Sequence, residues 1–231
     1  MKRIILLVLL LLSACQAKTI NTQSEDASST ESGVKISQVN TATIKEKVLI
    51  SSSGIGKAKL GMTLGQLKQI SDPDTKFEMI SSFTVDTNAI AVTKKDIVQY
   101  YILYPVETTS DSNKATPNDD DPITMLLTDN DRYQTKAGIK AGMPIKEAEK
   151  TYGNAVLAYN TEGESSEYVT FEDQKPENIR FRASNFELTA DGTELSGIYA
   201  DYPGVSYVTD KYRDDAAIAA IEVSCDPENC P

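Results

Sequence analysis

Two short segments of the chain combine the same start signal with the same pattern of apolar positions. Gly61-Met62-Thr63-Leu64 opens the first, and Gly142-Met143-Pro144-Ile145 opens the second, 81 residues later. A short alternating run precedes each segment, and apolar residues then recur every three or four positions, the spacing of one helical face. Each segment therefore predicts the start of a short amphipathic helix.

The first of these helices has clear start and stop signals. Thr63 and Gln66 match a capping box, in which the hydroxyl and the amide satisfy each other's backbone donors. Leu64, Leu67 and Ile70 then share one face, and Ser71-Asp72-Pro73 ends the helix. After it, apolar runs predict strands at 83–85, 89–93, 97–104 and 123–127, and a short strand at 48–50 precedes it.

The second helix follows the same plan with one substitution. Pro144 takes the place of the capping threonine, and proline is tolerated there because the start of a helix needs no backbone donor. Ile145, Ala148 and Tyr152 predict its buried face, and Gly153 its end. Strands are predicted at 156–159, 168–171, 179–183, 195–199 and 218–223. Because the approach to Ile218 is rich in alanine, 216–223 remains open between strand and helix.

Each unit is thus predicted to be a helix followed by an antiparallel meander. The predicted fold class is α+β, with two tandem helix-plus-meander repeats, 48–128 and 129–231, packed as one globular unit.

The first residues of the chain are typical of a bacterial lipoprotein. Lys2 and Arg3 precede an apolar run, 4–12, that is too short to span a bilayer. Leu12-Ser13-Ala14-Cys15 resembles a lipobox, which predicts a signal peptide at 1–14 and lipidation of Cys15. The alternative is an ordinary secretory signal that happens to contain a cysteine.

The lipid would anchor the protein stably, because a diacylglyceryl group and an amide-linked chain exceed the two-anchor threshold. By resemblance to Gram-negative lipoproteins, Gln16 predicts the outer membrane, with the domain facing the periplasm; surface display stays open. Residues 15–47 are polar and predict a flexible tether.

Composition narrows the classes of partner. Without residues 1–14, 21 basic residues face 34 acidic ones, a formal charge of −13, which argues against nucleic acid. Cys225 and Cys230 then remain, and an even pair in an oxidising compartment predicts a disulfide that clips the C-terminal tail.

At the two Gly-Met segments the chain resembles a group of small secreted bacterial proteins whose repeats begin apolar-x-apolar-Gly-Met-Thr. The β-lactamase-inhibitor proteins and the SmpA-type lipoprotein of the outer-membrane assembly machinery belong to this group. The resemblance implies a helix layer on an antiparallel sheet that is free to bind a protein. It also implies structural roles: Gly61 and Gly142 turn the chain, Met62 and Met143 pack beneath the helix, and Thr63 caps it.

Candidate catalytic chemistry is sparse. The chain has no histidine, which excludes a Ser-His-Asp arrangement and the commonest zinc ligand. The acidic run 107–122 lacks the spacing of an EF-hand and is predicted to be a solvated loop, so no metal or cofactor is expected. A carboxylate-type hydrolase is a minor alternative.

One alternating run suggests a binding surface. Arg180 and Arg182 fall on the face of 179–183 opposite the apolar residues, and Tyr168 and Tyr199 lie on predicted strands nearby. Arginine and tyrosine are enriched among interface anchors, so these four are candidate partner contacts. The alternative is that the arginines pair with neighbouring acids: Glu167, Glu172 and Glu187.

The sequence therefore predicts a non-catalytic outer-membrane lipoprotein that binds another cell-envelope protein, as an assembly factor or an inhibitor. The alternative is a periplasmic lipoprotein that binds a small ligand or a cell-wall fragment.

The anchor is directly testable. Replacement Cys15→Ser should leave the protein uncleaved or soluble, because the lipidated thiol is lost. Membrane fractionation measures this, and a variant that fractionates normally with the membrane would refute the anchor.

Overall fold

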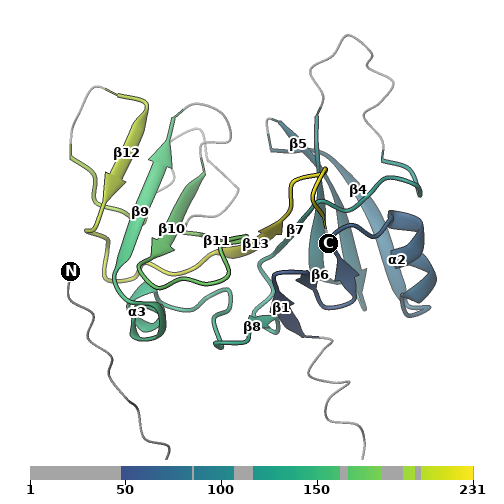
Figure 1. Ribbon diagram of the computed structural model, residues 1–231, viewed down its shortest axis with the longest axis horizontal. Coiled ribbons are helices and arrows are strands. Elements are labelled where there is room, and N and C mark those ends of the chain that lie inside the picture. The colour runs from purple at the N-terminus through teal and green to yellow at the C-terminus, as the bar shows by residue number, and fades with distance from the viewer. Residues whose placement is uncertain are drawn as a thin grey trace, which may run out of the picture. The chain divides into compact units, whose positions relative to one another are not determined.

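Nine strands lie side by side in one sheet that runs through both halves of the chain (Figure 1). The computed structural model describes residues 48–84, 86–106, 117–161, 166–183, 195–200 and 204–230, so the predicted signal peptide and tether lie outside the described residues. The sheet order is β12-β9-β10-β11-β13-β7-β6-β5-β4. Its strands are β4 (Thr75–Thr84), β5 (Thr87–Lys94), β6 (Ile97–Pro105), β7 (Met125–Thr128), β9 (Ala155–Asn160), β10 (Glu167–Phe171), β11 (Ile179–Arg182), β12 (Ser206–Thr209) and β13 (Ala220–Ser224).

The last strands of the two halves join the sheet together. β4 to β7 pair antiparallel in sequence order, and so do β9, β10, β11 and β13. β13 then pairs antiparallel with β7, with Glu222 opposite Leu127 and Val223 opposite Leu126. This pairing makes one continuous sheet out of two runs of strands.

A smaller sheet is built from short segments far apart in the sequence. Its order is β3-β2-β1-β8, from β1 (Leu49–Ser51), β2 (Gly54–Ile55), β3 (Ala58–Lys59) and β8 (Gln134–Thr135). β1 runs parallel to β8, so the start of the described chain is tied to the connector between the two halves.

The predicted α+β fold class is wrong, because the described chain is mostly β. It contains thirteen strands in two sheets and only two helices, α2 (Leu64–Ile70) and α3 (Ile145–Tyr152). Helices of seven and eight residues are about two turns long, too short to form a layer over nine strands. The core is supplied mainly by strand side chains, which periodicity around the two helix starts did not reveal.

The two Gly-Met segments make matching backbone contacts. The Gly61 N–H donates to Ile123 O and the Gly142 N–H to Ile218 O, both at 2.8 Å. Gly61 and Gly142 have φ of 81° and 79°, a region that favours glycine. Each helix start is thereby fixed beside the approach to the last strand of its own half.

The two helix starts differ in their caps. Thr63 and Gln66 form the reciprocal capping box, with bonds of 2.9 and 3.2 Å, whereas Pro144 makes no side-chain cap bond. The predicted buried residues of α3 are buried, but Ile70 at the end of α2 is 51% exposed because it lies in the last turn, beyond the packed surface.

Side-chain alternation gives the large sheet two different faces. Leu126, Ile102 and Phe181 belong to the main core on the inner face, together with α2 and α3. Leu127 and Leu103, one position along, belong to a smaller apolar cluster on the outer face. The outer face therefore has its own apolar centre, where the two halves meet.

Several strand boundaries differ from the predicted ones. Phe83 and Thr84, from the strand expected at 83–85, form the end of β4, which begins at Thr75; residue 85 lies outside the described residues. The segment 195–199 is no strand, whereas β12 was not predicted. The open segment 216–223 enters strand β13 at Ala220.

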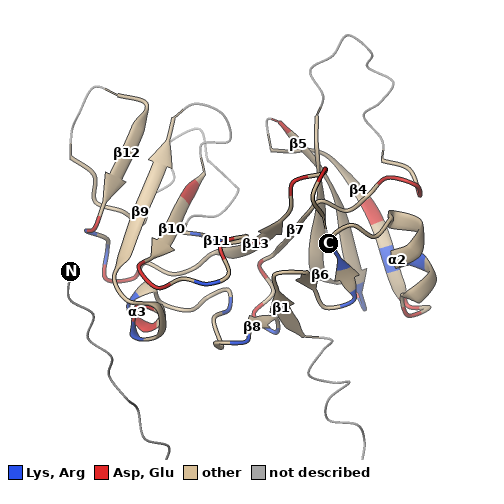
Figure 2. Cartoon of the chain, viewed as in Figure 1, with Lys and Arg blue, Asp and Glu red and all other residues tan. Residues whose placement is uncertain are grey.

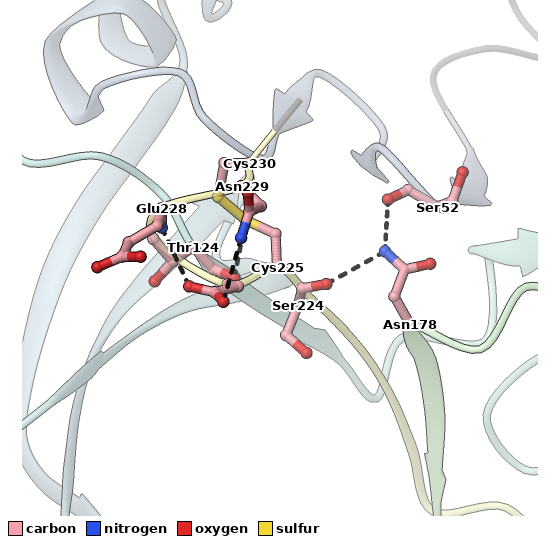
Figure 3. Close-up of a disulfide and its surroundings, with 9 residues drawn as sticks. Ser52, Thr124, Asn178, Ser224, Cys225, Glu228, Asn229 and Cys230 are labelled. Carbon is pink, nitrogen blue, oxygen red and sulfur yellow. Dashed lines mark hydrogen bonds between the residues drawn. A yellow bond between two sulfur atoms is a disulfide. The ribbon is translucent and has the colours of Figure 1, made fainter.

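The C-terminal tail is closed by a disulfide between Cys225 and Cys230 (Figure 3). The Cys225 N–H donates to Thr124 O at 2.9 Å, just before β7. Asn178 Nδ2 donates to both Ser52 O and Ser224 O, at 2.7 and 3.1 Å (Figure 3). The tail is thus held to β7, and the end of β13 is linked through Asn178 to the small sheet.

An ion cluster centred on Asp72 holds the end of α2 in the first half. The Asp72 carboxylate contacts Lys57 Nζ and Lys94 Nζ, both at 2.7 Å, and Lys57 also donates to Ile70 O at 3.0 Å. The hydrogen bond from Lys57, and then that from Lys94, hold the pKa of Asp72 well below its ordinary value of 3.8. Asp72 therefore links α2 to the small sheet and to β5.

We expect Asp72→Asn to lower the free energy of unfolding at neutral pH by about 1 kcal/mol, since the cluster is partly exposed to solvent. A carboxylate whose folded pKa is lowered stabilises the protein above its unfolded pKa, and this stabilisation is lost as the pH falls. The difference in the free energy of unfolding between wild type and Asp72→Asn should therefore become smaller as the pH falls below 3.8. Urea unfolding across pH measures it, with exposed Asp131→Asn as control. A difference that grows in acid would contradict the role of Asp72.

Candidate functional site

Four side chains from three neighbouring strands meet on the outer face of the large sheet. Arg180 lies directly opposite Glu222 in the β11–β13 pairing, and Tyr168 lies opposite Arg182 in the β10–β11 pairing. Because side chains alternate along each strand, all four of these point to the outer face of the sheet. The strands therefore bring two guanidinium groups, one carboxylate and one aromatic ring together.

Glu222 binds both arginines. Its Oε1 accepts from Arg180 Nη1 at 3.1 Å, and its Oε2 accepts from Arg182 Nη2 at 2.7 Å and from Arg182 Nε at 3.2 Å. Arg182 Nη1 also donates to Ser166 Oγ at 3.0 Å. The side chains of Arg182 and Glu222 are each only 1% exposed, so this pair is part of the interior of the outer face.

Arg180 differs from Arg182 in its exposure and in its unused donors. Its side chain is 48% exposed, and its guanidinium carbon lies 3.9 Å from the centre of the Tyr168 ring. Beyond the Nη1 bond to Glu222, no described residue accepts from its Nε or Nη2. Arg180 therefore places a positive charge at the surface of an acidic protein, in which Asp and Glu occur in both halves of the described chain (Figure 2). Stacking and the ion pair hold that charge in a fixed orientation.

A pocket of about 440 Å³ lies beside Arg180 on this face. Outer-face side chains from six strands contribute to its lining: Met125, Ala158, Tyr168, Arg180, Val208 and Glu222. Asn160, Ser166 and Ser206 add polar groups. Ala158 lies between Val208 and Tyr168 in the strand register, and its small side chain leaves room between these two larger ones.

An exposed apolar area continues from this pocket toward the β12 edge. Val156, Ile198 and Val208 are 38%, 55% and 70% exposed, and all three line a second hollow of about 550 Å³. Val208 lines both hollows. Single exposed apolar side chains are ordinary, but neighbouring ones around a hollow are typical of contact surfaces. We call Val156, Ile198, Val208 and Arg180 the β9–β12 surface.

Glu167 and Tyr199 lie on the opposite face and form a separate buried site. The Glu167 carboxylate is 0% exposed and accepts the backbone N–H groups of Ser196 and Gly197, both at 2.7 Å, and the Tyr199 hydroxyl at 2.8 Å. Burial, and then the nearby Glu167 charge, raise the pKa of Tyr199 well above its ordinary value. This carboxylate explains why 195–199 is not a strand. It binds backbone N–H groups that would otherwise donate to the carbonyl groups of a neighbouring strand.

The structure brings together only part of the predicted contact set. Arg180 and Tyr168 stack at the pocket, whereas Arg182 is buried behind them. Tyr199 donates its hydroxyl to Glu167 on the other face and also lines the second hollow, but it does not line the pocket beside Arg180. Among the described residues, the acid that pairs with both arginines is Glu222, which sequence reasoning did not consider because it lies 40 residues beyond Arg182. Glu187, one of the acids considered from the sequence, lies outside the described residues. Its one detectable signal was a charged residue within the apolar run 220–223.

Two further features are absent from the described residues. Among them, no group of three or more Asp, Glu or Cys side chains is arranged to hold a metal ion. Neither of the two described helices has the length and apolar character needed to cross a membrane.

Comparisons with known proteins identify no family. No protein-family model and no curated protein matches the chain. The uncharacterised protein YfeY of Escherichia coli, known from a crystal structure, is similar over 78% of this chain and 99% of its own, with 16% identity and a TM-score of 0.42. A likeness this weak supports no inference about fold or function.

We expect Glu167→Gln to lower the free energy of unfolding by about 2 kcal/mol, because a buried carboxylate that accepts three hydrogen bonds is replaced by a group with a surplus donor. Hydrogen exchange at Ser196 and Gly197 should also quicken. Glu78→Gln, on the exposed edge strand β4, is the matched control. Unchanged exchange at both amides would show that the carboxylate does not hold 195–199 in place.

Proposed function

We propose that this protein is a non-catalytic, lipid-anchored binding module that contacts another cell-envelope protein through its β9–β12 surface. Cys15 carries the lipid, the outer membrane is the site of anchoring, and the folded domain faces the periplasm. The partner is an assembly factor or an enzyme that the module inhibits.

The observation that carries the proposal is the meeting of an exposed apolar area with one oriented charge. Val208 is shared by two hollows, and Arg180 stands at one of them with its guanidinium held on Tyr168. Protein interfaces commonly combine exposed apolar side chains with arginine and tyrosine anchors, and a side chain that is held before binding loses less entropy on contact.

The edge position of β12 adds a second support. β12 ends the order of the large sheet, so its outer backbone groups face away from β9. Short edge strands next to apolar side chains can accept an extended segment of a partner, which gives affinity through main-chain bonds and selectivity through pockets.

The second candidate function is the binding of a small ligand or cell-wall fragment. One observation favours it: a pocket of about 440 Å³ lies within the size range of small-molecule sites. The two candidates differ in what occupies the surface around Val208, which is the basis of the experiment.

A photo-crosslinking residue, p-benzoylphenylalanine, is placed at Val208 of the full-length protein in cells of its source. A discrete adduct with one envelope protein is expected, because Val208 is 70% exposed and lies between the two hollows. The matched control carries the same residue at Ile97, which is 45% exposed and lies on β6. No adduct at Val208, or the same adducts at both positions, would refute the partner contact.

A further inference from the structure

The pocket beside Arg180 has the features of a carboxylate site. We infer that it binds a carboxylate carried next to an apolar group, with Arg180 as the recognition residue. This inference rests on the proposed function, because we assign the carboxylate to a peptide segment of the envelope partner.

The first argument is the positive group that the pocket presents. Arg182 and Glu222 are buried, whereas the Arg180 side chain is 48% exposed. An incoming anion therefore meets a guanidinium group, although the chain as a whole has a net charge of −11. A single exposed guanidinium group suits a single carboxylate.

The second argument is the geometry of the guanidinium. One face of Arg180 lies over Tyr168, and Nη1 is used by Glu222. Nε and Nη2 form one edge of the guanidinium fork, and no described residue accepts from either. That edge donates two parallel hydrogen bonds, which suits the two oxygens of a carboxylate. Because stacking and the ion pair already fix the group, little side-chain entropy remains to be lost on binding.

The third argument is the lining around the charge. Met125, Ala158 and Val208 are apolar, and they line the pocket from β7, β9 and β12. An apolar group attached close to the carboxylate would be removed from water there. The ligand class is therefore an acid with a neighbouring aliphatic or aromatic group, such as an acidic or C-terminal peptide segment.

The test uses two probes that differ in one group. N-acetyl-L-leucine carries a carboxylate and a leucyl side chain, and N-acetyl-L-leucinamide is its neutral counterpart. Calorimetric titration of the detergent-purified full-length protein should show binding of the acid that is ~10-fold or more tighter than binding of the amide, since a hydrogen-bonded charge pair is lost in the amide. Equal binding of the two probes, or no binding of the acid at millimolar concentration, overturns the inference.

Variants of Arg180 assign the site. Arg180→Gln should abolish the preference for the acid, while Arg180→Lys should keep part of it, because lysine retains the charge without the planar fork. Arg132→Gln, at an exposed arginine of the connector, is the matched control and should behave as wild type. Circular dichroism verifies folding of each variant. An unchanged preference in a folded Arg180→Gln protein would show that the carboxylate binds elsewhere.

Competition separates this inference from the proposed function. If the partner supplies the carboxylate, N-acetyl-L-leucine should reduce the adduct formed at Val208 and the amide should not. If the probe binds but no adduct forms at Val208, the protein partner is refuted, and the ligand of the site is a free small molecule that carries a carboxylate. If the adduct still forms in Arg180→Gln and N-acetyl-L-leucine does not reduce it, the contact with a protein partner stands. The inference that Arg180 binds a carboxylate of that partner is then overturned.

Discussion

The pairing of β13 with β7 is the contact on which the rest of the structure depends. It joins the last strand of each half, so two runs of antiparallel strands become one sheet. Its register sets Glu222 opposite Leu127 on one side, while β11 sets Glu222 opposite Arg180 on the other. Because neighbouring positions point to opposite faces, a shift of one residue in either pairing would move Glu222 into the apolar core. The position of the charge group on the outer face thus depends on these two registers.

The outer face changes from apolar to charged where β7 meets β13. Leu127 and Leu103 form a small apolar cluster at the centre, and the buried pair of Arg182 and Glu222 lies directly beside it. A buried ion pair contributes little net stability, because desolvation offsets most of its attraction, but removing one partner leaves an uncompensated charge. This pair therefore acts chiefly to position Arg180, the one exposed member. The arrangement places an oriented guanidinium between a pocket with both polar and apolar lining and an exposed apolar surface.

Glu167 has a comparable positioning role on the opposite face. Its carboxylate accepts hydrogen bonds from two backbone N–H groups and from the Tyr199 hydroxyl. These backbone groups are therefore bound to one side chain and not to a neighbouring strand. Both buried carboxylates, Glu167 and Glu222, hold other groups in place. Neither role can be recognised from local spacing, because their partners lie 29 to 42 residues away in the sequence.

Local features are what the sequence by itself determined. The two helix starts, the capping box at Thr63, the turn glycines and the buried residues of α3 all follow from signals within a few residues. Tertiary structure alone decided the mostly β fold class, the small sheet, the burial of Arg182 and the separation of Tyr199 from Arg180. The physical reason is that periodicity specifies which side chains share a face of one element. Which strands become neighbours, and in which register, depends on packing between segments far apart in the chain.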